Sequence, residues 1–184
     1  MSGGAWEVLA LPAAVLCAAA WIYNRLVADR NLAREGFADI DVQLKRRADL
    51  VPPLVEAVRG YAAHEKALLT SVAELRSAAM AARPGVDAGR FDSERELGAR
   101  LKQLLLLQEA YPQLKADANF RDLSAKLVDV EDHLQYARRF YNGAVKQYRN
   151  RLESFPHVLV ARAFGFQALP FFETDDRAAP SVQL

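Results

Sequence analysis

The sequence predicts an all-α protein in which an N-terminal transmembrane helix is followed by an antiparallel bundle of about four long helices. Three observations predict this fold class: an uncharged apolar run near the N-terminus, long downstream stretches with apolar residues at every third or fourth position, and few helix breakers between them. The 184 residues, 52% of them hydrophobic, can bury one good core. We therefore expect one folded domain with appendages.

Charges are nearly balanced and alternate along the chain. There are 24 Lys and Arg residues against 23 Asp and Glu residues, and neither sign gathers into a block. A nucleic-acid-binding surface needs a concentrated basic patch, so we expect no nucleic-acid partner. Cys17 is the one cysteine, so no disulfide and no cysteine metal cage can form within one chain.

The first 27 residues are predicted to anchor the chain in a lipid bilayer. Residues 8–24 are uncharged, and a helix that starts at about residue 5 can cross roughly 25 to 30 Å. Trp6 stands near one end and Trp21 and Tyr23 near the other, where amphipathic rings settle at the boundary between lipid and water. We expect residues 5–27 to contact the bilayer.

Arg25 opens a basic flank after the apolar run, and this flank predicts the orientation of the chain. No basic residue precedes the run, whereas six follow it closely: Arg25, Arg30, Arg34, Lys45, Arg46 and Arg47. Basic residues stay on the cytoplasmic side, so the body is expected in the cytoplasm and the N-terminus outside.

Two alternatives to an uncleaved anchor are a cleaved secretory signal and a buried core helix. Secretory signals begin with basic residues, which are lacking here, although the three alanines at 18–20 resemble a cleavage site. The position of the run and its basic exit favour the anchor over a core helix.

The body, residues 28–155, shows four stripes of apolar residues at helical spacing. Pro52 and Pro53 should stop or kink the first helix. The second should run from Pro53 to about Ala82, before the breakers at 83–85, and Asp92 or Ser93 should cap the third. The four stripes are Phe37, Ile40, Leu44 and Ala48; then Leu54, Val58, Tyr61, Glu65, Leu68, Val72, Leu75 and Ala79; then Leu97, Leu101, Leu104, Gln108 and Tyr111; and last Phe120, Leu123, Leu127, Val130, Leu134, Ala137, Tyr141, Val145, Tyr148 and Leu152.

An apolar, aromatic segment follows the last stripe. Residues 156–173 contain Phe164, Phe166, Phe171 and Phe172 and are too short and too interrupted for a further long helix. If successive helices alternate in direction, this segment returns to the membrane, where it either covers the end of the bundle or lies in the lipid interface. Residues 174–184 are polar and small and are expected to be disordered.

Short sequence pieces spread from Tyr23 to Phe172 resemble the LemA family. The pieces stand in order along the chain: Tyr23-Asn24; 40–47 with 49–52 and Leu54-Val55; Gly60-Tyr61-Ala62 with His64-Glu65; Glu109-Ala110-Tyr111-Pro112 with 114–116; Asn119-Phe120; Ala137-Arg138 with Tyr141-Asn142; and Phe155-Pro156. This resemblance implies a bacterial protein with one spanning helix and a helical body on one side of the membrane, here the inner membrane. It implies no reaction.

Sequence patterns typical of catalysis are missing. No Glu stands three positions before His64, His133 or His157, as a di-iron bundle requires, and metalloprotease spacing and a phosphate-binding glycine loop are also missing. His64 beside Glu65 resembles a phosphate-accepting histidine only weakly, because no nucleotide-binding domain accompanies it. We predict no catalytic residues, no metal, no cofactor and no enzyme activity.

Several charged or polar residues lie on or beside the apolar stripes and are predicted to form a structural polar network. Glu65 falls on the core seam, where Arg47, Arg138 or the hydroxyl of Tyr61 are candidate partners. The favoured role of this network is to fix helix register, and a ligand site is the alternative. Its predicted members are Asp41, Arg47, Glu65, Glu131, Arg138 and Asn142.

The sequence thus predicts a membrane-anchored, non-catalytic scaffold whose helical surface binds a protein partner. Homo-oligomerisation is compatible with this prediction. The alternative is a periplasmic or secreted bundle that binds a small apolar ligand in its core after signal cleavage.

Overall fold

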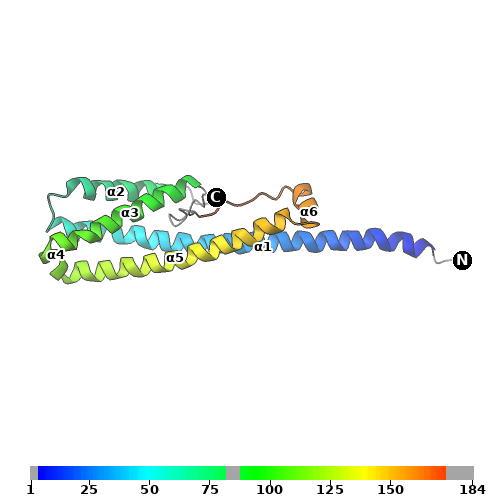
Figure 1. The fold of residues 1–184 in the computed structure, drawn as a ribbon, viewed down its shortest axis with the longest axis horizontal. Helices are drawn as coiled ribbons and strands as arrows, with labels where there is room; N and C mark the ends of the chain where they lie inside the picture. The colour runs from blue at the N-terminus through cyan, green and yellow to red at the C-terminus, as the bar shows by residue number, and fades with distance from the viewer. Residues whose placement is uncertain (1–3, 82–87, 173–184) are drawn as a thin grey trace, which may run out of the picture. The chain divides into compact units, whose positions relative to one another are not determined.

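The computed structural model describes residues 4–81 and 88–172, and every regular element in them is a helix. The all-α prediction is confirmed (Figure 1). The elements are α1 (Gly4–Arg59), α2 (Lys66–Ala81), α3 (Ala88–Ala110), α4 (Pro112–Ala116), α5 (Ala118–Glu153) and α6 (His157–Ala163). Residues 82–87, with the breakers predicted at 83–85, and residues 174–184 lie outside the described part.

Two compact units make up the described chain. The first unit contains residues 4–37 with 139–171, and the second contains residues 38–81 and 88–138 with Phe172. The unit boundaries therefore fall within α1 and within α5.

Pro52 and Pro53 were expected to stop or kink the first helix, and α1 continues through both, so they do not stop it. A proline at position 52 has no amide proton for the carbonyl of Ala48, four residues earlier. Arg76 of α2 fills this role, because its Nε donates to the Ala48 oxygen at 2.8 Å. The side chain of another helix thus replaces the missing backbone bond.

The break predicted at the prolines occurs instead at residues 60–65, and the predicted continuous second helix is wrong. The amides of Tyr61 and Ala62 both turn back to the carbonyl of Val58, at 3.0 and 2.8 Å. Ala62 is fully buried in this turn, whereas Tyr61 is exposed. Helix α2 begins only at Lys66.

Helix α3 begins at Ala88, so neither Asp92 nor Ser93 caps it, contrary to prediction. At the other end, Tyr111 and Pro112 lead into the short α4. Asp117 then caps α5, because its Oδ1 accepts the amide of Phe120 at 2.7 Å. Its Oδ2 accepts the hydroxyl of Tyr61 at 2.9 Å, which ties the 60–65 turn to the start of α5.

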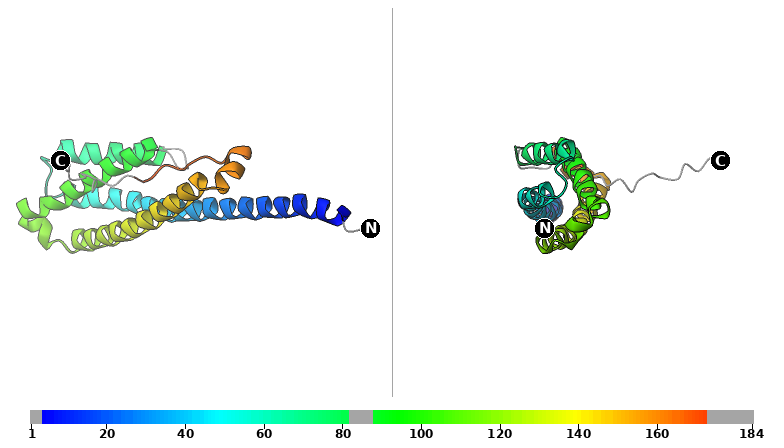
Figure 2. Two further views of the ribbon diagram at one scale, coloured as in Figure 1. Left: turned by 45° about the vertical axis from the view of Figure 1, so that its right-hand side comes forward. Right: turned by 90° about the vertical axis from the view of Figure 1, so that its left-hand side faces the viewer.

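The second unit is a bundle formed by the C-terminal part of α1, α2, α3 and the N-terminal part of α5 (Figure 2, right). Its apolar stripes meet in one core, as the helical spacing predicts. The core residues are Val51, Leu54, Val55, Val58, Ala62, Leu69, Val72, Ala79, Leu97, Leu101, Leu104, Leu114, Phe120, Leu123 and Leu127.

In the first unit, α1 and the C-terminal part of α5 run antiparallel and α6 packs against them. Phe37 contacts Tyr141, with ring centroids 5.8 Å apart, and further toward the N-terminus Trp21 lies 6.3 Å from His157. The shared core consists of Ile22, Leu26, Tyr148 and Ala161.

Gly36 permits a close approach of α1 to α5 in this unit. A Cβ atom there would lie 2.8 Å from Cδ1 of Phe140 and 3.2 Å from Cα of Tyr141. The second contact is to backbone, which cannot move aside as a flexible side chain can. Glycine is therefore the residue that fits this packing distance.

Candidate functional site

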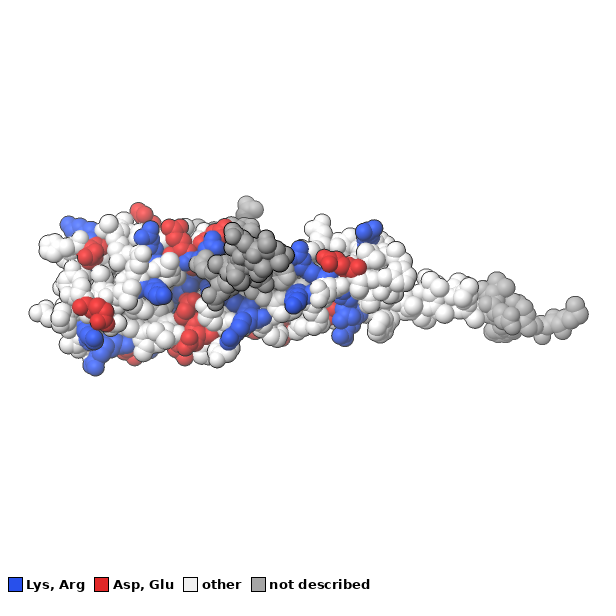
Figure 3. Space-filling model, in the orientation of Figure 1, with Lys and Arg blue, Asp and Glu red and all other residues white. Residues whose placement is uncertain are grey.

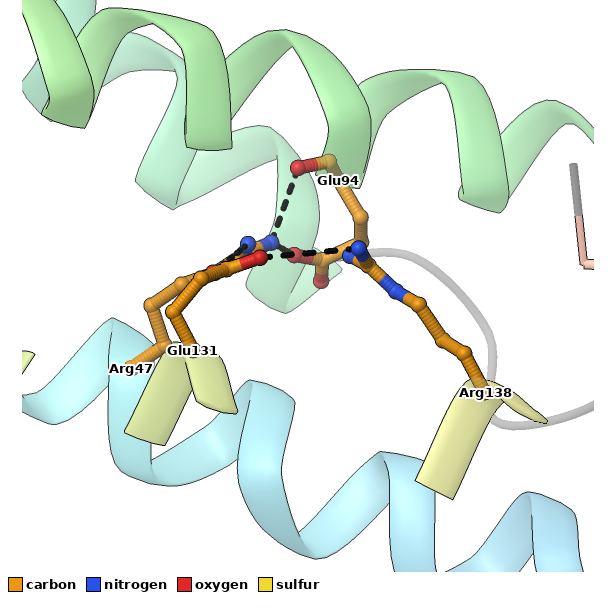
Figure 4. Close-up of polar contacts among 4 residues, drawn as sticks. All are labelled: Arg47, Glu94, Glu131 and Arg138. Carbon is orange, nitrogen blue, oxygen red and sulfur yellow. Dashed lines mark hydrogen bonds and ion pairs between the residues drawn. The ribbon is translucent and has the colours of Figure 1, made fainter. Parts of the chain in front are cut away.

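Arg47 is the centre of a buried ion-pair network in the second unit. It projects from α1 and is only 1% exposed. Its Nη2 donates to Oε2 and to the backbone oxygen of Glu94 on α3, at 2.5 and 2.8 Å, and its Nη1 donates to Oε2 of Glu131 on α5 at 3.2 Å (Figure 4). One guanidinium thus joins three helices.

Arg138 extends the network along α5. Its Nη1 lies 3.5 Å from Oε1 of Glu131, the carboxylate that Arg47 also binds (Figure 4). The guanidinium stacks 4.6 Å from the ring centroid of Phe172, which in turn packs on Phe91 at 4.2 Å. Burial lowers the pKa of Arg138, and the carboxylates of Glu131 and Glu94 oppose that shift.

An open groove of about 680 Å³ lies above this network, between α3 and α5. Leucine, valine, alanine and phenylalanine side chains form its apolar part, and charged side chains of both signs line most of the rest. Gly98 leaves room for the Arg47 guanidinium, because a Cβ at this position would stand 3.2 Å from Nη1 of Arg47. The lining residues are Arg47, Glu94, Arg95, Gly98, Ala99, Leu101, Lys102, Leu105, Leu127, Val128, Glu131, Asp132, Gln135, Arg138 and Phe172.

The N-terminal part of α1 is the second functional candidate. From residue 10 onward α1 is long and apolar enough to cross a bilayer, and only 11% of its most apolar window is buried. Leu11, Val15 and Leu16 are 73, 62 and 71% exposed, which a core helix would not show. In Figure 3 this apolar stretch of α1 carries no charged side chain. Side chains of both charges are interspersed over the visible face of the body.

The aromatic and basic residues predicted at the ends of this segment lie on α1. Trp21 is 63% exposed and Tyr23 37%. The Arg25 side chain is half exposed, and its Nε stands 4.0 Å from Asp29. The side chain of Trp6 lies outside the described part.

Comparison with known proteins identifies the family. The model of the LemA family matches residues 36–184. The chain belongs to the LemA family.

Curated relatives of this LemA protein are magnetosome proteins. The magnetosome protein MamQ of Magnetospirillum gryphiswaldense is 22% identical over 174 residues, which cover 82% of this chain and 64% of the relative. Magnetosome proteins MamQ 1 and MamQ 2 of Paramagnetospirillum magneticum are each 21% identical over 175 residues, with the same coverage. The chain thus spans less than two thirds of the length of these relatives.

Contacts in the structure connect several of the sequence pieces that carry the LemA resemblance. The Arg47–Glu131–Arg138 contacts join the piece that ends at Arg47 to the Ala137-Arg138 pair. The Tyr61–Asp117 bond links the Gly60-Tyr61-Ala62 turn to the helix start just before Asn119-Phe120. These pieces thus hold helix crossings and turns.

Of the six residues predicted for the polar network, the structure brings Arg47, Glu131 and Arg138 together. Glu65 is half-buried beside a different partner, since the hydroxyl of Tyr111 lies 3.5 Å from its Oε1. Asp41 and Asn142 are half-buried on α1 and α5.

Two buried carboxylates were missed at the sequence level. Glu94 is 3% exposed and Asp29 is 4% exposed. In the first unit, Gln147 donates to Oδ1 of Asp29 at 3.0 Å, and Arg151 pairs with its Oδ2. A signal existed, because Glu94 stands three residues before Leu97 and Asp29 three residues after Leu26, each on an apolar stripe.

Two arginines and two glutamates neutralise one another, and among the described residues that line the groove there is no serine, threonine or cysteine. Among the residues that the structure describes, no three His, Cys, Asp or Glu side chains gather to hold a metal ion.

Proposed function

We propose that this LemA-family protein is a membrane-anchored, non-catalytic helical scaffold whose groove between α3 and α5 receives a helical segment of a protein partner. The observation that carries the proposal is the exposure of large apolar side chains along the start of α1, a helix that continues into the bundle. Exposed contiguous apolar surface on this scale is rare in soluble proteins and marks contact with a membrane or a partner.

Lipid explains this surface better than a protein does. The segment is apolar on all sides, as a spanning helix requires, and carries neither the charges nor the polar face of a helix that packs on a soluble partner. Trp21 and Tyr23 at its end match the residues that favour the membrane boundary. The basic residues that follow favour a cytoplasmic body.

The groove supplies the recognition surface. Leu105 and Val128 offer apolar contact, while Arg95, Lys102 and Asp132 offer charges of both signs. An amphipathic helix fits such a surface, because its apolar face buries in the floor and its polar flanks meet the charges at the rim. The buried arginine network beneath holds α1, α3 and α5 in register, so the groove is preformed.

Two measurements on the protein from native membranes test the anchor. The mass of the mature chain should include the segment from Trp6 to Tyr23, and sodium carbonate should leave the protein in the membrane. A mature mass without this segment would support the alternative, a secreted bundle that binds a small apolar ligand. Complete extraction by carbonate would refute the anchor.

Photocrosslinking tests the groove. A photoreactive amino acid at Val128, which is 53% exposed in the groove, should give a discrete adduct in membranes, and Leu105→Asp should abolish it. The matched control is Met80 on α2, 54% exposed and outside the groove. Equal adducts from both positions, or an adduct insensitive to Leu105→Asp, would refute the groove as the binding surface. An adduct of twice the chain mass would identify a second copy as the partner.

A further inference from the structure

The short helix α6 lies at the same level along α1 as the predicted exit from the membrane. Tyr23 makes edge contacts with the rings of Phe164 and Phe166, with centroids 5.0 and 5.5 Å apart. Trp21 lies 6.3 Å from the ring of His157. Figure 1 and the left view of Figure 2 show α6 beside α1 in this unit. The segment from residue 155 to 166 is called the α6 hairpin below.

The α6 hairpin is apolar on its inner and outer sides. Inward, Ala161 belongs to the core that Ile22 and Leu26 form, and Val160 and Phe166 pack against it. Outward, Phe155, Leu159 and Phe164 are 80, 59 and 64% exposed. A hairpin that only covered the helix pair would bury these three side chains and expose polar ones.

We propose that the α6 hairpin is a second membrane-contacting element, which lies in the headgroup region of the same bilayer leaflet in which the α1 span ends. Its exposed apolar side chains enter the boundary between headgroups and acyl chains, as those of interfacial helices do. This inference rests on the proposed membrane anchor.

The surroundings of the hairpin favour lipid as its occupant. Its outer surface is continuous with the exposed rings of Trp21 and Tyr23, which already mark the water boundary of the anchor. Exposed Arg162 on α6 and half-exposed Arg25 on α1 bring positive charge to the same level, where lipid phosphates lie. Arg30 stacks on Phe166 at 5.1 Å and supports that ring from the side of the body.

Depth-dependent fluorescence quenching in the full-length protein tests the proposal. The sole cysteine, Cys17, is exposed within the apolar segment and serves in the wild type as the probe of the anchor. In a Cys17→Ser background, Leu159→Cys and Phe164→Cys report on the hairpin, and Met80→Cys reports on an exposed site of the second unit. Each protein carries an environment-sensitive dye in vesicles of phosphatidylcholine and phosphatidylglycerol with lipids brominated along the acyl chain.

The expected result is strong quenching at Cys17, clear quenching at positions 159 and 164 that is greatest with shallow bromines, and little quenching at position 80. Quenching at 159 and 164 no greater than at position 80, with Cys17 still quenched, would overturn the hairpin proposal and leave the anchor intact. An unquenched Cys17 would overturn both. Far-UV circular dichroism should match the wild type, since the side chains of Leu159, Phe164 and Met80 are all exposed.

Discussion

Arg47 shows how one buried charge organises helix packing. Moving a guanidinium out of water is unfavourable by several kcal/mol unless carboxylates and carbonyls replace its hydration. Glu94 supplies both a carboxylate and a backbone oxygen, and Glu131 supplies a second carboxylate. These contacts tie the guanidinium on α1 to α3 and α5 at once, which favours a role of the network in fixing helix register.

Replacing Glu94 by alanine should destabilise the protein by about 3 kcal/mol, the lower end for breaking a buried ion pair, because Glu131 still binds Arg47. Urea unfolding of the full-length protein in detergent measures the change. The control is Asp92→Ala on the same helix, which removes an exposed pair with Arg95 and should change stability by no more than about 0.5 kcal/mol. Equal effects of the two substitutions would contradict the role given to the network.

Asp117 gives a pH dependence with a definite sign. The amide of Phe120 and the hydroxyl of Tyr61 lower the pKa of this carboxyl below its ordinary value. Its contribution to stability is therefore present above the ordinary carboxyl pKa and is lost as the pH falls through the lower, folded-state pKa. The wild type should exceed Asp117→Ala in unfolding midpoint by a constant margin from neutral pH to about pH 5, and this margin should shrink below about pH 4.

Unfolding midpoints measured across that range test the prediction, and Tyr61→Phe serves as the companion variant. Tyr61→Phe removes the hydroxyl that is the second cause of the lowered Asp117 pKa. The difference in unfolding midpoint between Tyr61→Phe and Asp117→Ala should therefore begin to shrink at a higher pH than the difference between the wild type and Asp117→Ala. A margin independent of pH down to pH 3 would show that Asp117 does not act as a charged cap.

At the scale of the element, helix α1 depends on a bond from α2. The carbonyl of Ala48 would have no backbone donor at Pro52, and the Nε of Arg76 supplies one. Secondary structure at this point is thus completed by tertiary contact.

Arg76→Met should destabilise the protein by about 1 to 2 kcal/mol, as expected for a hydrogen bond from a charged donor to a part-buried carbonyl. In a Pro52→Ala background, where the amide returns, the same substitution should cost clearly less. A double-mutant cycle from urea unfolding measures this coupling. Additive effects would mean that Arg76 does not stand in for the missing amide.

The helical class and the core stripes followed from the sequence because apolar periodicity is a local property. Interruptions were harder to place. Pro52 indicates in the sequence that the carbonyl of Ala48 lacks a backbone donor. No nearby residue indicates that Arg76 of α2 supplies one, so the sequence could not show that α1 continues past the prolines. The turn at 60–65 was hidden because Tyr61 and Glu65 continue the spacing of Val58, although Tyr61 points to Asp117 on the surface.

The site was predictable to the extent that charges flank apolar stripes. Arg47, Glu131 and Arg138 were found in this way. Glu94 was missed because the third stripe was predicted to begin one turn later, at Leu97. Asp29 was missed because it lies between the predicted anchor and the first predicted stripe, which begins at Phe37. The pairing of each arginine with its carboxylate depends on which helices pack together. The spacing of residues along the sequence does not determine that packing.

At the scale of the whole molecule, the distribution of basic residues predicts the side on which the body lies. Arg25, Arg30 and Arg34 follow the apolar segment closely. In a Cys17→Ser background, a membrane-impermeant maleimide should label Ser2→Cys in intact spheroplasts, and should label exposed Lys126→Cys only after permeabilisation. The reverse pattern would place the bundle outside the cytoplasm.

Gly36 carries a further consequence for the first unit. The hydrogen atom that glycine carries in place of a side chain lets α1 and α5 approach closely at this point. A methyl group would clash with the main chain at Tyr141 and push the two helices apart. A larger distance between the two helices would weaken the packing of Phe37 on the Tyr141 ring. It would also weaken the hydrogen bond that the Tyr141 hydroxyl donates to the carbonyl of Pro170 at 2.7 Å. The glycine at position 36 thus determines whether the C-terminal segment around Pro170 stays bound to α5.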